Sequence, residues 1–272
     1  MSRSAPSDPY PERIVCLTEE PTEVLYHLGE QDRIVGISQF TVRPEEARRD
    51  KPKVSAFTSA RLERILELDP DLVIGFSDIQ ADIARDLIKK GVEVWISNHR
   101  TVEGILSYIV RLGSLVGRHD DARDWVADIR QGIEAVSASA ARLPTRPRVY
   151  FEEWDDPMIT AIRWVSEVIG IAGGEDIFRD RSTSSLAADR IIEDHAEVVR
   201  RYPDVLLASW CGKKLQPHAV WDRPGWDALE PVQNRTIHEI PAEIILQPGP
   251  AALTDGLDHI HDIIEEWTDS ST

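Results

Sequence analysis

Large aromatic side chains end several of the apolar runs that the sequence predicts to be buried strands. Phe76, Trp154 and Trp210 each close a run of strand length. In open α/β sheets, ligands bind beyond the carboxyl ends of the strands, and aromatic faces there supply stiff apolar contact area. We therefore predict a cleft for a large, flat, partly apolar ligand. The predicted ligand-binding residues are Phe40, Phe57, Phe76, Trp154, Asp155, Trp164, Trp210 and Lys213.

Carboxylates share these predicted strand ends with the aromatic residues. An acidic rim attracts cations and disfavours oxyanions and anionic chelates, although Arg163, Lys213 and Lys214 offset part of the charge. The acidic residues concerned are Glu19, Glu20, Asp78, Glu152, Glu153, Asp155 and Asp156.

Metal binding and catalysis are weaker interpretations of the same residues. Asp155, Cys211 or Glu152 would be the ligands of a bare metal ion. Cys211 and His218 would be the nucleophile and base of an enzyme, but no third group that orients the base can be identified. The sequence also lacks a P-loop and a dinucleotide fingerprint. We therefore expect no enzymatic activity, no catalytic cofactor and no dedicated metal site.

The elements that must position these residues alternate between strand and helix. This alternation is typical of parallel sheets with helices on both faces, and it restarts after Pro147. We predict an α/β fold of two Rossmann-like lobes with parallel sheets, joined by one long backbone helix. The predicted parts are residues 1–118, 119–143 and 144–272. The predicted strands are 13–17, 34–38, 54–57, 71–76, 92–97, 148–154, 203–210 and 236–240.

The joining helix is predicted from apolar residues spaced three or four apart along residues 119–143. Pro144 ends the pattern, because proline cannot continue the helical hydrogen-bond ladder. An ordinary domain helix is the alternative interpretation. The apolar positions are Ala122, Trp125, Val126, Ile129, Ile133, Val136, Ala140 and Leu143.

One motif occurs in both predicted lobes. Residues 65–75 and 198–208 each combine a helix end, a Pro-Asp turn and a buried strand. The strands that open the lobes also correspond, since Arg13 and Arg148 begin similar apolar runs. A diverged duplication of one α/β lobe explains the match, and chance similarity between buried strands is the alternative.

Composition limits the partners and the location. The net charge of −17 over 272 residues argues against nucleic acid and against anionic membrane surfaces. No apolar run reaches the roughly 18–20 residues that a membrane span needs. Residues 1–10 lack the apolar core of a signal peptide, which predicts a cytoplasmic location. A periplasmic location is the alternative, for a chain whose leader has been removed.

Residues 13 to about 267 resemble the helical-backbone (class III) substrate-binding proteins of ABC importers. These proteins serve the import of vitamin B12, iron–siderophore chelates and haem, and the chain is most similar to the cobalamin-binding branch. The similarity is most specific in the stretches 13–29, 62–74 and 165–178. They include Glu20-Pro-Thr-Glu-Val-Leu25, Asp69-Pro-Asp-Leu-Val-Ile74 and Gly170-Ile-Ala-Gly-Gly-Glu-Asp-Ile-Phe178.

The resemblance implies two lobes on one long helix, modest lobe motion, and a ligand held between the lobes against aromatic residues. Phe57 falls where cobalamin binders carry a tryptophan. The resemblance also implies that one glutamate of each lobe docks on a permease. Glu63 falls on the first of these positions, whereas Ala196 stands at the second with Glu197 beside it.

Together these observations predict a non-enzymatic protein that binds cobalamin or a related corrinoid, as a solute-binding protein of ABC-importer type. An ABC permease that contacts Glu63 and Glu197 is its expected partner. The alternatives are a binder of a ferric siderophore, haem or a metal ion, and an enzyme of cofactor metabolism.

Overall fold

The structure, a computed structural model, describes residues 9–56 and 59–271. The chain divides into two compact units. The N-terminal unit comprises residues up to His99 together with Glu103–Asp128, and the C-terminal unit comprises Arg100–Val102 and the residues from Ile129 onward. The division falls within one helix, α6 (His119–Ala140). The predicted boundaries at residues 118 and 143 stay a prediction.

The N-terminal unit is built on a five-stranded parallel sheet in the order β3-β2-β1-β4-β5. All five strands were predicted from apolar runs, because strands buried on both faces lack the polar alternation of a half-exposed sheet. The strands are β1 (Ile14–Cys16), β2 (Ile34–Ser38), β3 (Lys53–Ser55), β4 (Leu72–Phe76) and β5 (Val94–Ser97).

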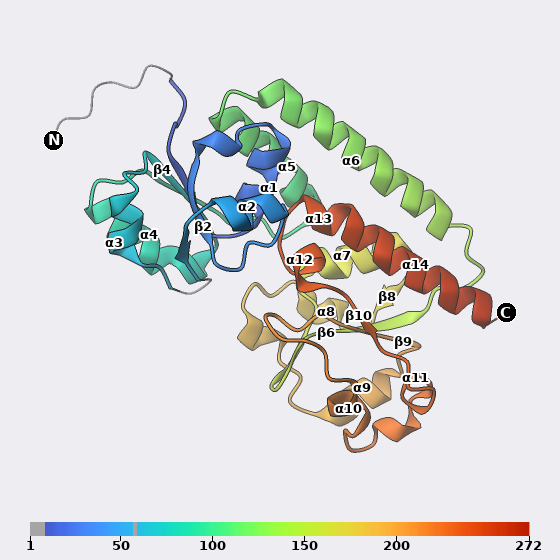
Figure 1. Ribbon diagram of the computed structural model, residues 1–272. Helices are drawn as coiled ribbons and strands as arrows, with labels where there is room; N and C mark the ends of the chain where they lie inside the picture. Colours follow the sequence, from blue (N-terminus) through green and yellow to red (C-terminus); the bar gives the residue numbers. More distant parts are fainter. Residues whose placement is uncertain (1–8, 57–58, 272) are drawn as a thin grey trace. The chain divides into compact units, whose positions relative to one another are not determined.

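Helices cover both faces of this sheet. Figure 1 shows α3 and α4 on one side and α1 and α5 on the other. Ile65 of α3 and Leu87 of α4 pack with Val15 and Val73 of the sheet in one buried cluster. The helices are α1 (Glu20–His27), α2 (Glu45–Asp50), α3 (Leu62–Glu67), α4 (Ala81–Lys89) and α5 (Val102–Leu115), with 3-10 turns η1 (Gln31–Arg33) and η2 (Asp78–Gln80).

The C-terminal unit also has a five-stranded sheet, but only part of it is parallel. The strand order is β10-β9-β6-β7, and β8 also pairs with β6. β7 runs antiparallel to β6, because Asp156 and Pro157 turn the chain straight back into a hairpin that the parallel prediction missed. The strands are β6 (Arg148–Asp155), β7 (Met158–Thr160), β8 (Glu175–Asp176), β9 (Val205–Ala208) and β10 (His238–Glu239).

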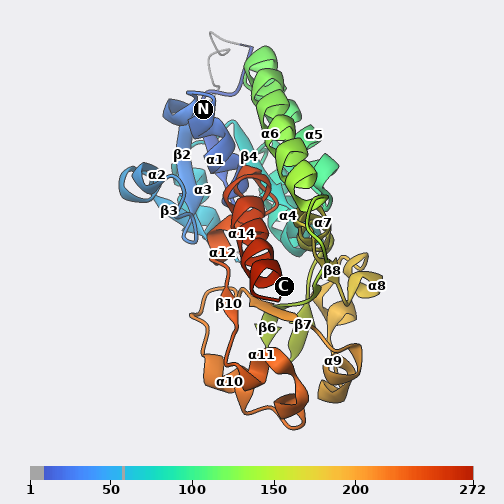
Figure 2. The ribbon, with the colours of Figure 1, turned by 90° about the vertical axis from the view of Figure 1, so that its right-hand side faces the viewer.

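Two longer helices of the C-terminal unit pack against each other. α14 (Asp255–Ser270) runs beside α7 (Arg163–Ala172) (Figures 1 and 2). The remaining helices are short, and most have four or five residues, which are too few to show a helical period. They are α8 (Arg179–Ser182), α9 (His195–Arg201), α10 (Pro217–Trp221), α11 (Glu230–Gln233), α12 (Ala242–Ile245) and α13 (Pro250–Leu253), with 3-10 turns η3 (Ala187–Arg190) and η4 (Trp226–Ala228).

The long helix predicted at 119–143 is α6, which is uninterrupted over 22 residues. It ends three residues before the predicted bound. Ala122, Val126 and Ile129 on its apolar face are buried. Trp125 stacks on His27 of α1 with ring centroids 3.5 Å apart, within the N-terminal unit.

The repeated Pro-Asp motif forms the same polar clamp in each unit. Asp71 accepts the backbone N–H of Arg13 at 2.9 Å, and Asp204 accepts that of Arg148 at 2.7 Å. Each arginine also donates to a backbone carbonyl at the end of the helix that precedes the Pro-Asp turn. The acceptor is Leu68 O for Arg13 and Arg201 O for Arg148. The arginine and the aspartate of each clamp hold equivalent positions in the two units, and both aspartates lie in the Pro-Asp motif matched by sequence. This agreement supports a diverged duplication over chance similarity.

These clamps generate a stability prediction. We expect Asp71→Ala and Asp204→Ala each to lower the free energy of unfolding by about 1–2 kcal/mol, because each leaves a strand-end N–H without its acceptor. Asp→Asn variants, which keep one carbonyl oxygen, should lose less. Chemical denaturation measures the change. Glu193→Ala, at an exposed loop position, is the control, and losses no larger than in this control would contradict the clamp.

Candidate functional site

Four of the predicted ligand-binding residues lie together at the carboxyl ends of β6 and β9 in the C-terminal unit. The Lys213 ammonium lies over two indole rings, 4.3 Å from the ring centroid of Trp154 and 4.7 Å from that of Trp210. Lys213 also pairs with the carboxylate of Asp155. We call Trp154, Asp155, Trp210 and Lys213 the tryptophan cluster.

The register of two neighbouring parallel strands places the two tryptophans. Glu152 of β6 pairs with Ala208 of β9, and each tryptophan comes two residues after its member of this pair. The backbone N–H of Ser209 continues this ladder by donating to Glu152 O at 2.9 Å. On the β7 side the register of β6 shifts between Glu152 and Trp154, so regular alternation alone does not orient Trp154. The Lys213 ammonium lies over both rings, which shows that the two indoles come together at these strand ends.

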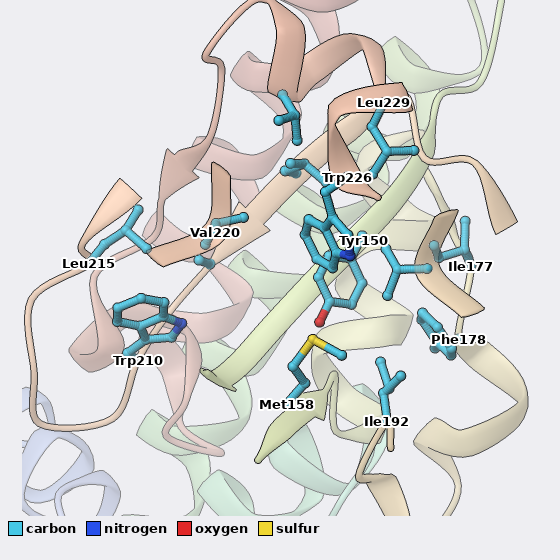
Figure 3. Close-up of a cluster of buried hydrophobic side chains, with 14 residues drawn as sticks. Tyr150, Met158, Ile177, Phe178, Ile192, Trp210, Leu215, Val220, Trp226 and Leu229 are labelled. Carbon is cyan, nitrogen blue, oxygen red and sulfur yellow. The ribbon is translucent and has the colours of Figure 1, made fainter. Parts of the chain in front are cut away.

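A buried ion pair fixes Trp210. Glu152 is 1% exposed, and its carboxylate accepts two hydrogen bonds from Arg223, at 2.5 and 2.9 Å. It also accepts from the Tyr150 hydroxyl at 2.8 Å and from Trp210 Nε1 at 3.1 Å. Figure 3 shows Tyr150 beside Trp226 within the buried cluster and Trp210 at its edge near Leu215. Burial, followed by the Glu152 charge, raises the pKa of Tyr150 well above its usual value, so the phenol stays a donor.

The same pairing corrects the hypothesis that Glu152 is a metal ligand. Its two oxygens already accept four hydrogen bonds, two of them from a guanidinium. Among residues 9–56 and 59–271, no three His, Cys, Asp or Glu side chains are grouped closely enough to share a metal ion. Cys211 is exposed beside the tryptophan cluster.

Three of the seven carboxylates of the predicted acidic rim pair with basic side chains from distant parts of the chain. Glu152 pairs with Arg223, Glu153 with Arg190 at 2.6 Å, and Asp155 with Lys213. Lys213 was expected to offset part of the charge, but the two arginines, which lie 71 and 37 residues from their partners, were not predicted. These three pairs weaken the attraction of cations that the sequence predicts for this edge.

Two further acidic residues of the predicted rim are buried in the N-terminal unit. Glu19 is 7% and Glu20 1% exposed, directly after β1. Burial, opposed in part by hydrogen bonds, raises the pKa of Glu19 to about 7. Burial and then the neighbouring charge of Glu19 raise the pKa of Glu20 to about 8. Glu20 Oε1 accepts from the Thr18 hydroxyl at 2.7 Å, and the second oxygen of each glutamate has no partner among the described residues. At neutral pH Glu20 is therefore largely protonated, and Glu19 is protonated in part.

The other predicted ligand-binding residues do not join the tryptophan cluster. Trp164 at the start of α7 is buried, and its Nε1 donates to Ile245 O at 2.8 Å, which gives it a packing role. Phe76 is buried at the end of β4 against the edge of His99, and Phe40 is 45% exposed. Phe57 lies outside the described residues. Ligand contact by these residues stays a prediction.

The two predicted docking glutamates differ in their surroundings. Glu63 is exposed on α3, and within the described residues it has no ion-pair partner. Glu197 on α9 is half-buried and pairs with Arg181 at 2.7 Å and Arg201 at 2.9 Å. Ala196, which stands at the position the resemblance indicates, is exposed. Glu63 is therefore the more available of the two for an arginine of a partner protein.

An open hollow of about 990 Å³, which the sequence did not predict, lies on the N-terminal unit between α1 and α2. Tyr26 and His27 of α1 and Glu46 and Asp50 of α2 contribute to its lining.

No helix in the described part of the chain is both long and apolar enough to cross a membrane.

Comparison with known proteins gives consistent matches over most of the chain. A family model described as periplasmic binding protein matches residues 14–244. A vitamin B12-binding protein of Vibrio campbellii is 31% identical over 205 residues, which are 73% of this chain and 70% of that protein. A cobalamin-binding protein of Halobacterium salinarum is 26% identical, over 78% of this chain and 58% of that protein.

Solved structures confirm the predicted α/β fold class. The periplasmic vitamin B12-binding protein of Vibrio cholerae matches with a TM-score of 0.74 and 23% identity, over 94% of this chain and 98% of that chain, a likeness in fold alone. A periplasmic haem-binding protein of Roseiflexus sp. RS-1 matches with a TM-score of 0.79 and 25% identity, over 92% and 98% of the two chains.

The buried glutamates generate a prediction for pH dependence. The folded-state pKa of Glu20, about 8, lies above the ordinary value of 4.5. Its contribution to stability is therefore fully present below about pH 4.5 and is lost as the pH rises towards 8. We expect Glu20→Gln to gain stability relative to the unmodified protein by up to roughly 1 kcal/mol per pH unit across this interval. Denaturant unfolding at several pH values measures the difference.

The matched control for this series is Glu46→Gln, which removes an exposed carboxylate from α2. Its stability difference from the unmodified protein should stay nearly constant with pH. A Glu20→Gln difference that is equally constant would show that Glu20 ionises normally in the folded protein.

Proposed function

Because the chain belongs to the periplasmic binding protein family, we propose that it binds cobalamin or a related corrinoid for an ABC importer. The tryptophan cluster of the C-terminal unit is the proposed contact surface for the corrin ring. The observation that carries this proposal is the pair of indoles that lie around one ammonium at the ends of β6 and β9.

The chemistry of the tryptophan cluster suits such a ligand. A corrin ring is broad, flat and partly apolar, so most of its binding free energy must come from apolar area rather than from charge pairs. Two indoles supply such area with little loss of side-chain entropy. The charged groups around them are paired with one another, so a ligand without net negative charge meets no unbalanced field. The vitamin B12-binding and cobalamin-binding names of the relatives support the same ligand class.

The proposed role is binding without chemical change. The matched relatives are named as binding proteins. The predicted cytoplasmic location stays a prediction, and membership of the family supports its alternative, a periplasmic location.

The first experiment is gel filtration of the purified protein with hydroxocobalamin, followed by visible absorbance of the protein peak. We expect cobalamin to co-elute at about one per chain. Haemin is run separately, because one related structure is named as a haem-binding protein. A protein peak without cobalamin would reject the proposal. If haemin co-eluted and cobalamin did not, the ligand would be haem instead.

Variants of the cluster test its placement. We expect Trp154→Ala to weaken cobalamin binding by about 1–3 kcal/mol, which is roughly 5- to 150-fold in Kd, because an indole face is lost. Trp210→Phe keeps a ring but loses the N–H that donates to Glu152, so it should weaken binding less. Leu186→Ala, which truncates an exposed apolar residue of the same unit, is the control. Equal affinity in Trp154→Ala and this control would place the ligand elsewhere.

The docking role of Glu63 gives a separate prediction. We expect Glu63→Arg to abolish most cobalamin uptake into vesicles that carry the cognate permease, while cobalamin affinity in solution is unchanged. Glu67→Arg makes the same charge reversal at an exposed position of the same helix and is the matched control. Unchanged uptake with Glu63→Arg would show that the permease does not use this glutamate.

A further inference from the structure

Trp210 is covered in the free protein. The residue is 3% exposed, because one part of it belongs to the buried hydrophobic cluster and Lys213 lies over its ring. The Lys213 ammonium lies over its ring and over that of Trp154, and Asp155 pairs with the same ammonium. An ammonium between two aromatic faces and a carboxylate is held by cation–π attraction and by charge pairing. One of the chain's own side chains thus occupies the space that a ligand ring needs.

The indole cannot turn aside to admit a ligand, because it is fixed from behind. Trp210 Nε1 donates to Glu152, whose carboxylate is buried and bound by Arg223 and Tyr150. Rotation of the ring would leave a buried carboxylate short of a hydrogen bond, which is costly away from water. The strand end and the ring therefore form a rigid floor.

Lys213, in contrast, can leave at small cost. Its side chain is 37% exposed, and it lies in a turn in which the backbone N–H of Lys213 donates to Trp210 O at 3.3 Å. The preceding Gly212 has a φ of +76° and open space around its Cβ position, which leaves the turn uncrowded. When the ammonium swings outward, water solvates it, whereas Asp155, whose side chain is 18% exposed, loses its cation until the ligand contacts it.

We propose that Lys213 is a displaceable cover of the tryptophan cluster and the residue that sets ligand specificity there. Binding exchanges the Lys213 ammonium for the ring of the ligand, so that part of the contact energy of the ligand is used to release the lysine. This inference rests on the proposed function, since it assigns the order of events at the same site.

The exchange also defines which rings fit best. When Lys213 leaves, Asp155 loses its cation and faces the edge of the incoming ring. An uncompensated carboxylate favours a ring that carries hydrogen-bond donors, such as the amide side chains of a corrinoid, over one that carries carboxylates. Lys213 and Asp155 together thus select amide-bearing rings over anionic rings of similar size.

The test is cobalamin affinity of Lys213→Ala by isothermal titration calorimetry. We expect Kd to fall roughly tenfold, the size expected for release of one partly exposed cation–π and carboxylate contact. Lys214→Ala removes the exposed neighbouring lysine, which has no ion pair among the described residues, and should leave Kd unchanged. A Kd that rises or stays equal in Lys213→Ala would overturn the proposal, because the lysine would then be a ligand contact or a bystander.

A second readout follows Lys213 directly in the unmodified protein. Reductive methylation with mass spectrometry reports the reactivity of Lys213 relative to Lys214. Cobalamin should raise this ratio if the ammonium is released, and a lower ratio would show that the ligand buries it, against the proposal. Absence of cobalamin binding by the unmodified protein and by Lys213→Ala would reject the proposed function. Tight binding with an unchanged ratio would reject only the cover.

Discussion

The buried carboxylate of Glu152 is the constraint on which the C-terminal unit depends most. A charge that is 1% exposed is tolerable only when its acceptor sites are filled, and Arg223, Tyr150 and Trp210 fill them. This requirement brings residues from β6, from the end of β9 and from the segment after α10 to one point. The fixed position of Trp210 is a consequence of this requirement, so the same interaction stabilises the unit and orients one ring of the proposed ligand surface.

The N-terminal unit also buries carboxyl groups at the end of a strand, those of Glu19 and Glu20, but stabilises them in another way. When the repeated clamps are aligned, Arg13 on Arg148, Glu19 corresponds to Trp154 and Glu20 to Asp155. Within the described residues neither glutamate forms an ion pair with an arginine, and burial raises the pKa of both, so Glu20 is held largely as a neutral acid and Glu19 in part. One duplicated strand end thus carries protonated carboxyl groups in one unit and paired charges with indoles in the other. The clamps were retained because both sheets need their strand-end N–H groups satisfied.

Local patterns were sufficient to predict α6 and the parallel strands other than the two-residue β8, because strand and helix periods are visible within ten residues of sequence. The hairpin of β6 and β7 was missed, since a three-residue strand after Pro157 shows no alternation. The cluster of Trp154, Asp155, Trp210 and Lys213 was predicted from strand ends alone. Trp164 was predicted as another ligand-binding aromatic, but it is buried and donates to the backbone of Ile245 in α12. A residue at the start of a helix can face inward as well as outward. Arg190 and Arg223 had no local signal at all.

The distant partners also change what the site selects. Taken along the chain, the acidic residues at these strand ends suggest a negative field, in line with the net charge of −17. In space, Arg223, Arg190 and Lys213 each neutralise one carboxylate, so the field at the tryptophan cluster is small. Discrimination must then come from the shape and apolar area of the ring and from the edge groups that meet Asp155. The overall acidity is a property of the surface, and it carries no information about the ligand.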